Sequence, residues 1–297
     1  MKSIFNYKSS EIKLFVKEKT NWGAYFVVDD FIKNDVFRQL CYSYENLKKN
    51  REIFSDTFKA NVWRENEPKG FNFLFGGSGA NIEEFNELTK ANKIWKVFLE
   101  KIYSDSCLKY LNQIFFETKA YKDNVNERDL KEAKIGCKLS SQTNNYGDRI
   151  HQDSTQKVLS FLIYLDNNSW ESNSLGGTDL WEVKDYRIPY DKSHKSLDIK
   201  LRRGKYTAQS HSLKFSEANR IKKFLSIDFN PNRCIGFIRT SNSYHSVPPR
   251  ILPNYVTRDC FQINIWNFNR QRKYSKIQQL INFPEKIYKK ITSKINS

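Results

Sequence analysis

Apolar positions recur with two different spacings along this chain, and the change falls near residue 135. Before it, apolar residues recur every three or four positions, as in helices that bury one face. After it, apolar and polar residues alternate over short runs, as in half-buried strands. We therefore expect a single domain over residues 1–297, in which an N-terminal part, 1–134, supports an all-β core over 135–269.

The N-terminal part is predicted to begin with strands and turns over residues 1–30 and to continue with helices. Asn34 is a suitable N-cap for the first helix, and Lys48 and Lys49 give it the basic end that favours a helix C-terminus. The helical spacing covers residues 34–49, 81–102 and 108–115.

The core is predicted to consist of short antiparallel strands separated by polar turns. Its last strand alternates Phe261, Ile263 and Ile265 with polar residues, so one face should pack outward and the other should line a polar cavity. Such strands indicate a mainly β fold with supporting α-helices and a double-stranded β-helix (jelly-roll, cupin-type) core. The predicted strands cover residues 135–140, 157–165, 176–181, 234–238 and 258–266.

A metal site is predicted where two of these strands end. In an extended strand, residues two apart point the same way, so His151 and Asp153 face one point. A second histidine, His245, follows an apolar strand about ninety residues later. Two imidazoles and one carboxylate form the facial triad of Fe(II) oxygenases, which leaves positions open for a bidentate ligand and O2. Arg258 is then placed to hold the far carboxylate of a 2-oxo diacid.

Residues 135–268 resemble the Fe(II)/2-oxoglutarate-dependent dioxygenases, particularly the prolyl-4-hydroxylase-like branch. The match keeps the family's order: His151-Gln152-Asp153, then Ile163-Tyr164-Leu165-Asp166, Gly176-Gly177, Pro231-Asn232-Arg233, His245-Ser246-Val247 and Arg258. By this resemblance His151, Asp153 and His245 bind iron, and Arg258 and Tyr164 bind 2-oxoglutarate. The implied cofactors are Fe(II), 2-oxoglutarate and O2, with ascorbate as a further candidate.

Two features depart from the family pattern. Cys260 stands two residues after the arginine, where Ser or Thr is frequent. The segment between the Gly176-Gly177 strand and the strand before His245 is longer than a minimal barrel needs, and we interpret it as a substrate lid.

The resemblance implies hydroxylation of a C–H substrate with release of succinate and CO2. The substrate class stays open among peptidyl residues, amino acids, saccharides and other metabolites. Related halogenases replace the carboxylate ligand with a small residue, so Asp153 indicates hydroxylation, or desaturation or epoxidation, rather than halogenation. The alternatives are a nucleic-acid oxidative demethylase and a non-enzymatic cupin-like binding protein, the second of which would not need Arg258.

Four further residues are candidates for contact with substrate, although structural side chains of a half-polar barrel show the same pattern. They are Gln142, Trp181, Gln262 and Asn264. His194 and His211 lack an acidic partner at ligand spacing, so we expect them on the surface.

The net charge of +17 is concentrated in two segments, a basic insertion over 184–223 and a basic tail over 270–297. Lys and Arg outnumber Asp and Glu by 12 to 4 in the first and by 8 to 1 in the second. Codon bias is an alternative source of the excess, because Lys, Asn and Ile are all abundant. Both segments lie outside the predicted core, and no basic motif is interleaved with aromatics, so we expect an acidic small-molecule or peptidyl substrate rather than nucleic acid.

The tail is predicted to form a short basic amphipathic helix after Pro284, because Ile287, Ile291 and Ile295 recur every four positions. Such a helix binds either an anionic membrane surface or the protein's own core, and its marginal length favours the core. We expect a cytoplasmic protein, because the sequence has no apolar segment typical of a signal peptide or membrane span and its cysteines form no Cys-x-x-Cys pair.

Overall fold

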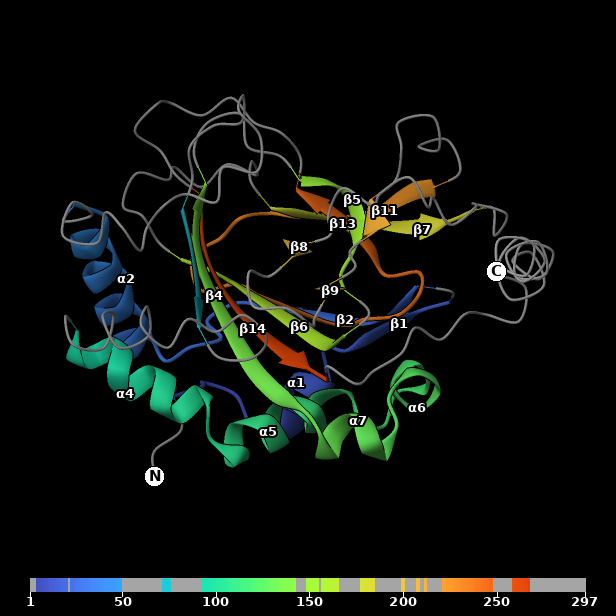
Figure 1. Ribbon diagram of the computed structural model, residues 1–297, viewed down its shortest axis with the longest axis horizontal. Helices are drawn as coiled ribbons and strands as arrows, with labels where there is room; N and C mark the ends of the chain where they lie inside the picture. The colour runs from blue at the N-terminus through green and yellow to red at the C-terminus, as the bar shows by residue number, and fades with distance from the viewer. Residues whose placement is uncertain are drawn as a thin grey trace, which may run out of the picture.

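The computed structural model describes residues 4–20, 22–49, 71–75, 92–142, 148–154, 156–165, 177–184, 199–200, 207–208, 211–212, 221–247 and 258–267. Within these residues a layer of helices covers one face of a large antiparallel sheet, and a smaller sheet lies across its other face (Figure 1). The predicted fold class, mainly β with supporting helices and a jelly-roll core, is confirmed. The two sheets share no strand among the described residues, so they face each other as separate layers.

The larger sheet, here called the major sheet, has the order β1-β2-β12-β6-β14-β4-β3. Its strands are β1 (Lys17–Lys19), β2 (Gly23–Val28), β12 (Cys234–Ile238), β6 (Lys157–Tyr164), β14 (Arg258–Trp266), β4 (Lys134–Gln142) and β3 (Phe71–Phe75). The smaller or minor sheet has the order β10-β5-β13-β7-β11. Its strands are β10 (His211–Ser212), β5 (Asp148–Gln152), β13 (Tyr244–Val247), β7 (Thr178–Val183) and β11 (Ile221–Ile227), and a separate pair joins β8 (Ile199–Lys200) to β9 (Thr207–Ala208).

Along the core, the chain crosses repeatedly between the two sheets, as in a jelly roll. The chain passes from β5 in the minor sheet to β6 in the major sheet, and later from β12 to β13 and back to β14. Strands distant in sequence thereby become neighbours, and β13 pairs with both β5 and β7.

The helical layer consists of α1 (Ser9–Lys13), α2 (Asn34–Lys49), α4 (Lys93–Ile102), α5 (Asp105–Phe115), α6 (Lys119–Asn124) and α7 (Glu127–Lys131). The predictions for residues 34–49 and 108–115 are confirmed by α2 and α5. The described part of the helix predicted over 81–102 is α4, and its predicted start lies outside the described residues. Helix α1 corrects the expectation of strands and turns over residues 1–30. It is held by a local bond in which the Lys8 backbone N–H donates to the Glu11 carboxylate at 2.5 Å.

The pleat of β14 separates the two faces of the major sheet. Phe261 points to the helices, where its ring centroid lies 5.7 Å from that of Trp95 and 5.3 Å from that of Phe98 in α4. Cys260 points the other way and belongs to the same buried cluster as Leu180 of the minor sheet. The predicted alternation along this strand is confirmed, because neighbouring residues serve two different cores.

The turn before β12 ties the site-bearing strands to the N-terminal part. Arg233 donates two hydrogen bonds to the Asp29 carboxylate, at 2.6 and 3.0 Å. Asn232 adopts a positive φ of 62°, which asparagine tolerates better than most residues. Its amide bonds both the N–H and the C=O of Ile32, and its backbone N–H donates to the Tyr164 carbonyl at 2.9 Å. The turn therefore fixes the end of β6 that carries Tyr164.

Strand β11, which no alternating pattern in the sequence predicts, begins at the end of the basic insertion. It pairs with β7 through a bulge between Lys223 and Leu225, and the bulge interrupts the two-residue alternation. Most of the basic insertion, the tail over 270–297 and His194 lie outside the described residues. Among the described helices, none has the length and apolar character needed to cross a membrane.

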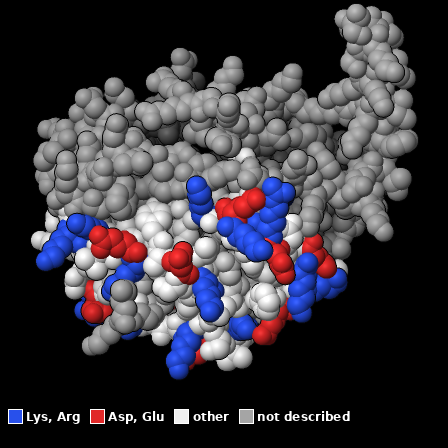
Figure 2. Space-filling view, turned by 60° about the horizontal axis from the view of Figure 1, so that its bottom comes forward, with Lys and Arg blue, Asp and Glu red and all other residues white. Residues whose placement is uncertain are grey.

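Charges of both signs are interspersed on the face that Figure 2 shows, which carries the helical layer. Within the helical layer, Lys119 and Asp123 of α6 form an ion pair at 2.8 Å, and Arg128 of α7 forms another with Glu132 at 2.8 Å. The described part of this face therefore presents no patch of a single sign.

Candidate metal centre

Two histidines from distant parts of the chain meet as opposite neighbours in the minor sheet. The register of β5 and β13 places His151 directly opposite His245, and their ring centroids lie 4.4 Å apart. Opposite residues of an antiparallel pair share one face, so both imidazoles point to the same side. The ring of Phe237, from β12 of the major sheet, lies 4.9 Å from that of His245. That side is therefore the interior between the sheets.

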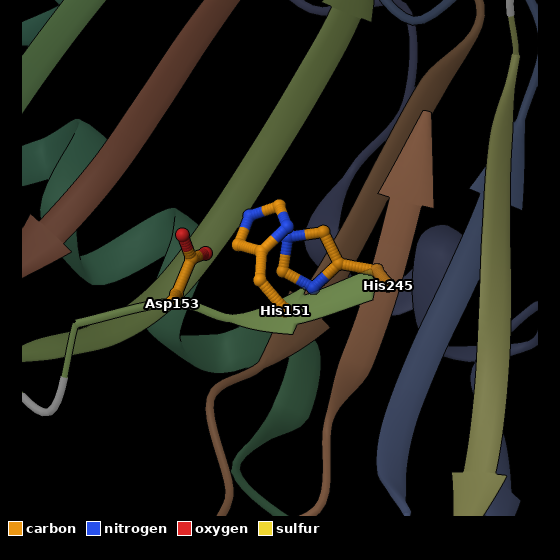
Figure 3. Close-up of side chains that lie close together, drawn as sticks. All are labelled: His151, Asp153 and His245. Atoms are coloured by element: carbon orange, nitrogen blue, oxygen red, sulfur yellow. The ribbon is translucent and has the colours of Figure 1, made fainter. Parts of the chain in front are cut away.

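Asp153 completes the group, just past the end of β5. Figure 3 shows its carboxylate beside the two imidazoles, on the same side of the sheet. One ligand atom from each of the three side chains lies within 4.8 Å of the other two. Within the described residues, these three side chains are the cluster of His, Cys, Asp or Glu residues whose spacing suits a metal ion.

A backbone carbonyl orients His245. Its Nδ1 lies 3.1 Å from the Ser243 oxygen, and a proton on Nδ1 that donates to this acceptor leaves the Nε2 lone pair for a metal. Burial and the neighbouring His151 lower the pKa of His245 to about 4, against the opposing effect of Asp153. The imidazole is therefore neutral near pH 7, the form that binds metals.

Both carboxylate oxygens of Asp153 accept hydrogen bonds. Lys157 donates to Oδ1 at 2.7 Å, and the Ser160 hydroxyl donates to Oδ2 at 2.8 Å. Burial acts to raise the pKa of Asp153, but the ammonium of Lys157 and the nearby imidazoles of His245 and His151 outweigh it and lower this pKa below its ordinary value. The carboxylate is therefore ionised at neutral pH, and each oxygen keeps a further lone pair for a metal.

The chemistry of this donor set fits a ferrous ion. Two imidazole nitrogens and one carboxylate oxygen on one side of a sheet are the ligands of the 2-His-1-carboxylate triad, which holds Fe(II) and leaves coordination positions open. Two of the ligands are hydrogen-bonded by neighbouring groups: His245 by the Ser243 carbonyl and Asp153 by the Ser160 hydroxyl. Such supporting contacts fix ligand orientation in metal proteins.

Arg258 and Tyr164 form a second polar cluster in the same interior. Arg258 is 3% exposed, and its guanidinium carbon lies 5.3 Å from the centroid of the Tyr164 ring. The Tyr164 hydroxyl is 2.7 Å from that of Thr178, which comes from β7 in the facing sheet. Burial raises the pKa of Tyr164 to about 12 despite the charge of Arg258, so the phenol stays neutral. A buried cation beside two hydroxyls is suited to bind a carboxylate.

The other sequence candidates fall on different faces. Gln262 and Asn264 share the inner face of β14 with Cys260, and Asn264 lies opposite Ser160. Trp181, a candidate for substrate contact, lies on the outer face of the minor sheet, where its indole donates to Ser246 at 2.8 Å. Trp181 therefore does not point into the space between the sheets, because the neighbouring residue, Leu180, occupies the inner face.

For the candidate Gln142, and for His211, which we expect on the surface, only the backbone position is described. Strand β10 places His211 opposite Gln152, and Gln142 ends β4, but the side chains of His211 and Gln142 lie outside the described residues.

Sequence reasoning missed four residues that support the site. They are Lys157, Ser160, Thr178 and Ser243. Each is an ordinary polar residue in or beside a strand, and only the pairing of the strands reveals its partner. The alternation along β6 could have predicted that Ser160 and Tyr164 share one face. It could not have predicted which residue each of them hydrogen-bonds.

No protein-family model and no curated protein matches this chain. Solved structures are similar to it at low sequence identity. A Pseudomonas putida prolyl-4-hydroxylase is 12% identical, with 88% of this chain and 99% of that chain covered and a TM-score of 0.41. The non-heme α-ketoglutarate-dependent carbocyclase SnoK from nogalamycin biosynthesis is 8% identical, with 88% and 86% covered and a TM-score of 0.48.

HygX from Streptomyces hygroscopicus, solved with nickel and 2-oxoglutarate bound, is 11% identical, with 86% of each chain covered and a TM-score of 0.40.

Proposed function

We propose that this protein is an Fe(II)- and 2-oxoglutarate-dependent dioxygenase that hydroxylates a C–H bond and releases succinate and CO2. The observation that carries the proposal is the convergence of His151, Asp153 and His245 within 4.8 Å, on the inner side of the minor sheet. The buried cation Arg258 lies in the interior between the same two sheets, as a binding site for a diacid requires.

Each residue has a distinct role in this proposal. His151, Asp153 and His245 hold the iron, which supplies the redox chemistry that couples O2 to oxidation of the co-substrate and the substrate. Arg258 pairs with the far carboxylate of 2-oxoglutarate, and the neutral hydroxyl of Tyr164 donates a hydrogen bond to it. The apolar side chains of Leu180, Phe229 and Phe237 exclude water from the space beside these groups.

The carboxylate of Asp153 also bears on the product. A ligand at this position leaves no vacated site for a halide, so we propose hydroxylation, or desaturation or epoxidation, and an outcome indifferent to chloride. The substrate class stays as broad as the sequence leaves it: a peptidyl residue, an amino acid, a saccharide or another metabolite.

The proposal is tested by co-substrate turnover. The purified protein should convert 2-oxoglutarate to succinate only when Fe(II) and O2 are both present. His151→Ala, Asp153→Ala and His245→Ala should each abolish turnover and Mn(II) binding measured by calorimetry, because each removes one of three ligands. Mass spectrometry of lysate from the protein's own source, incubated with the loaded enzyme, should show a product heavier by one oxygen atom.

A matched control separates ligand loss from general damage. Lys223→Met breaks an ion pair with Asp179 at 3.3 Å elsewhere in the minor sheet. This variant should keep both 2-oxoglutarate turnover and Mn(II) binding. Undiminished Mn(II) affinity in all three ligand variants would show that the site is misassigned, and a chlorinated product would contradict the role of Asp153.

A further inference from the structure

The carboxylate that is proposed to bind iron already forms an ion pair with a lysine ammonium. Lys157, the first residue of β6, places its Nζ 2.7 Å from Oδ1 of Asp153. The two side chains are only 13% and 12% exposed, so this ion pair is largely removed from water. Its Nζ also lies 5.4 Å from the centroid of the Trp266 ring, which adds a cation–π contact. The ammonium is thus held in place from two sides.

This ammonium changes the charge of the centre. The Asp153 carboxylate gives the three ligands a negative charge, and the ammonium of Lys157 offsets it in the metal-free protein. A divalent cation bound to the same carboxylate would sit close to a like charge in a partly desolvated space, where Coulomb repulsion is stronger than in water. Lys157 and the metal therefore compete for Asp153.

The carboxylate has a second support that carries no charge. Ser160, three residues further along β6, donates to Oδ2 at 2.8 Å and is itself buried. Removal of the lysine charge would therefore leave one bond that orients the carboxylate. Removal of the serine hydroxyl would instead leave the competing cation and lose that bond. The two residues act on the same ligand in opposite directions.

We propose that Lys157 is a positioning residue that acts through Asp153: it holds the carboxylate in place in the metal-free protein and weakens the binding of a divalent metal. This inference rests on the proposed function in one respect, that His151, Asp153 and His245 are metal ligands. It assigns to Lys157 an effect of charge, which a purely structural role would not produce.

The test is Mn(II) affinity of the full chain, measured by calorimetry. Lys157→Met and Lys157→Gln remove the charge and should bind Mn(II) about tenfold more tightly, or better. Lys157→Arg keeps the charge and should stay close to the wild type. Ser160→Ala should bind about tenfold more weakly, because an orienting contact to a ligand is lost. A purely structural role of Lys157 predicts weaker binding in all of its variants.

The chain offers a closely matched control. Lys223 also pairs with a buried carboxylate, that of Asp179 at 3.3 Å, and also lies over an indole ring, that of Trp181 at 5.8 Å. Lys223→Met should leave Mn(II) affinity unchanged, because Asp179 lies on the outer face of the minor sheet.

Each outcome decides the inference. Tighter binding in Lys157→Met and Lys157→Gln supports it, and equal or weaker binding overturns it. If neither variant folds, the wild type decides: the ¹⁵Nζ resonance of Lys157 should shift when saturating Zn(II) is added, and an unmoved resonance overturns the inference. A wild type that binds no Mn(II) overturns the proposed function itself, which distinguishes that failure from a failure of the role given to Lys157.

Discussion

At the scale of single residues, the candidate site depends on strand register. His151 and His245 meet only because β5 and β13 pair them directly, and a slip of one residue would move one imidazole to the outer face. The sequence predicts His151 and Asp153 because His-x-Asp spacing on a strand needs no knowledge of the fold, and it predicts His245 because that residue follows an apolar strand. It does not predict Thr178, whose hydroxyl reaches Tyr164 from the facing sheet, because no local pattern records a contact between sheets.

The role of Arg258 gives a prediction at this scale. Arg258→Ala should raise the concentration of 2-oxoglutarate needed for half-maximal turnover by about thirtyfold or more, because losing one partner of a buried charge pair costs about 2–5 kcal/mol. Mn(II) affinity should not change, because the residue is not one of the ligands. Arg258→Lys should recover part of the loss, since it keeps the charge but not the paired donors. An unchanged requirement for 2-oxoglutarate in Arg258→Ala would remove the co-substrate assignment.

At the scale of elements, the strands of the major sheet are those that the sequence predicts best. Four of them, β4, β6, β12 and β14, fall where alternating or continuous apolar runs indicate strands. Strand β11 is not predicted, because Lys222 and Lys223 fall beside a bulge that breaks the alternation. Helix α1, five residues long, is too short for a helical period to show.

The two faces of β14 give a prediction at this scale. Phe261→Ala should lower the free energy of unfolding by about 3–5 kcal/mol, because the ring is 1% exposed and packs against Trp95 and Phe98. Gln262→Ala, one residue along the same strand, should change it by less than about 1 kcal/mol, because it removes no core packing. Urea denaturation of both variants checks this. Equal losses would mean that the pleat does not separate the two cores.

At the scale of the whole molecule, the site lies where the two sheets are joined by polar contacts. His151 and His245 belong to the minor sheet, whereas Lys157 and Ser160, which hold Asp153, belong to the major sheet. The bond between Tyr164 and Thr178 is a second link of this kind. A metal bound to the three ligands would therefore favour the folded arrangement of both sheets, since the ligands converge only when the sheets are packed.

Thermal unfolding tests this coupling. A metal that binds only the folded protein adds about 2.7 kcal/mol of stability at a free concentration one hundred times its Kd. For a chain of 297 residues that should raise the Tm by about 4 °C. Mn(II) should produce this shift in the wild type and in Arg258→Ala, which keeps all three ligands, but not in His245→Ala. Differential scanning calorimetry with and without Mn(II) provides the measurement. An equal shift in His245→Ala would place the stabilising metal elsewhere in the molecule, because that variant has lost the ligand that β13 brings to the centre.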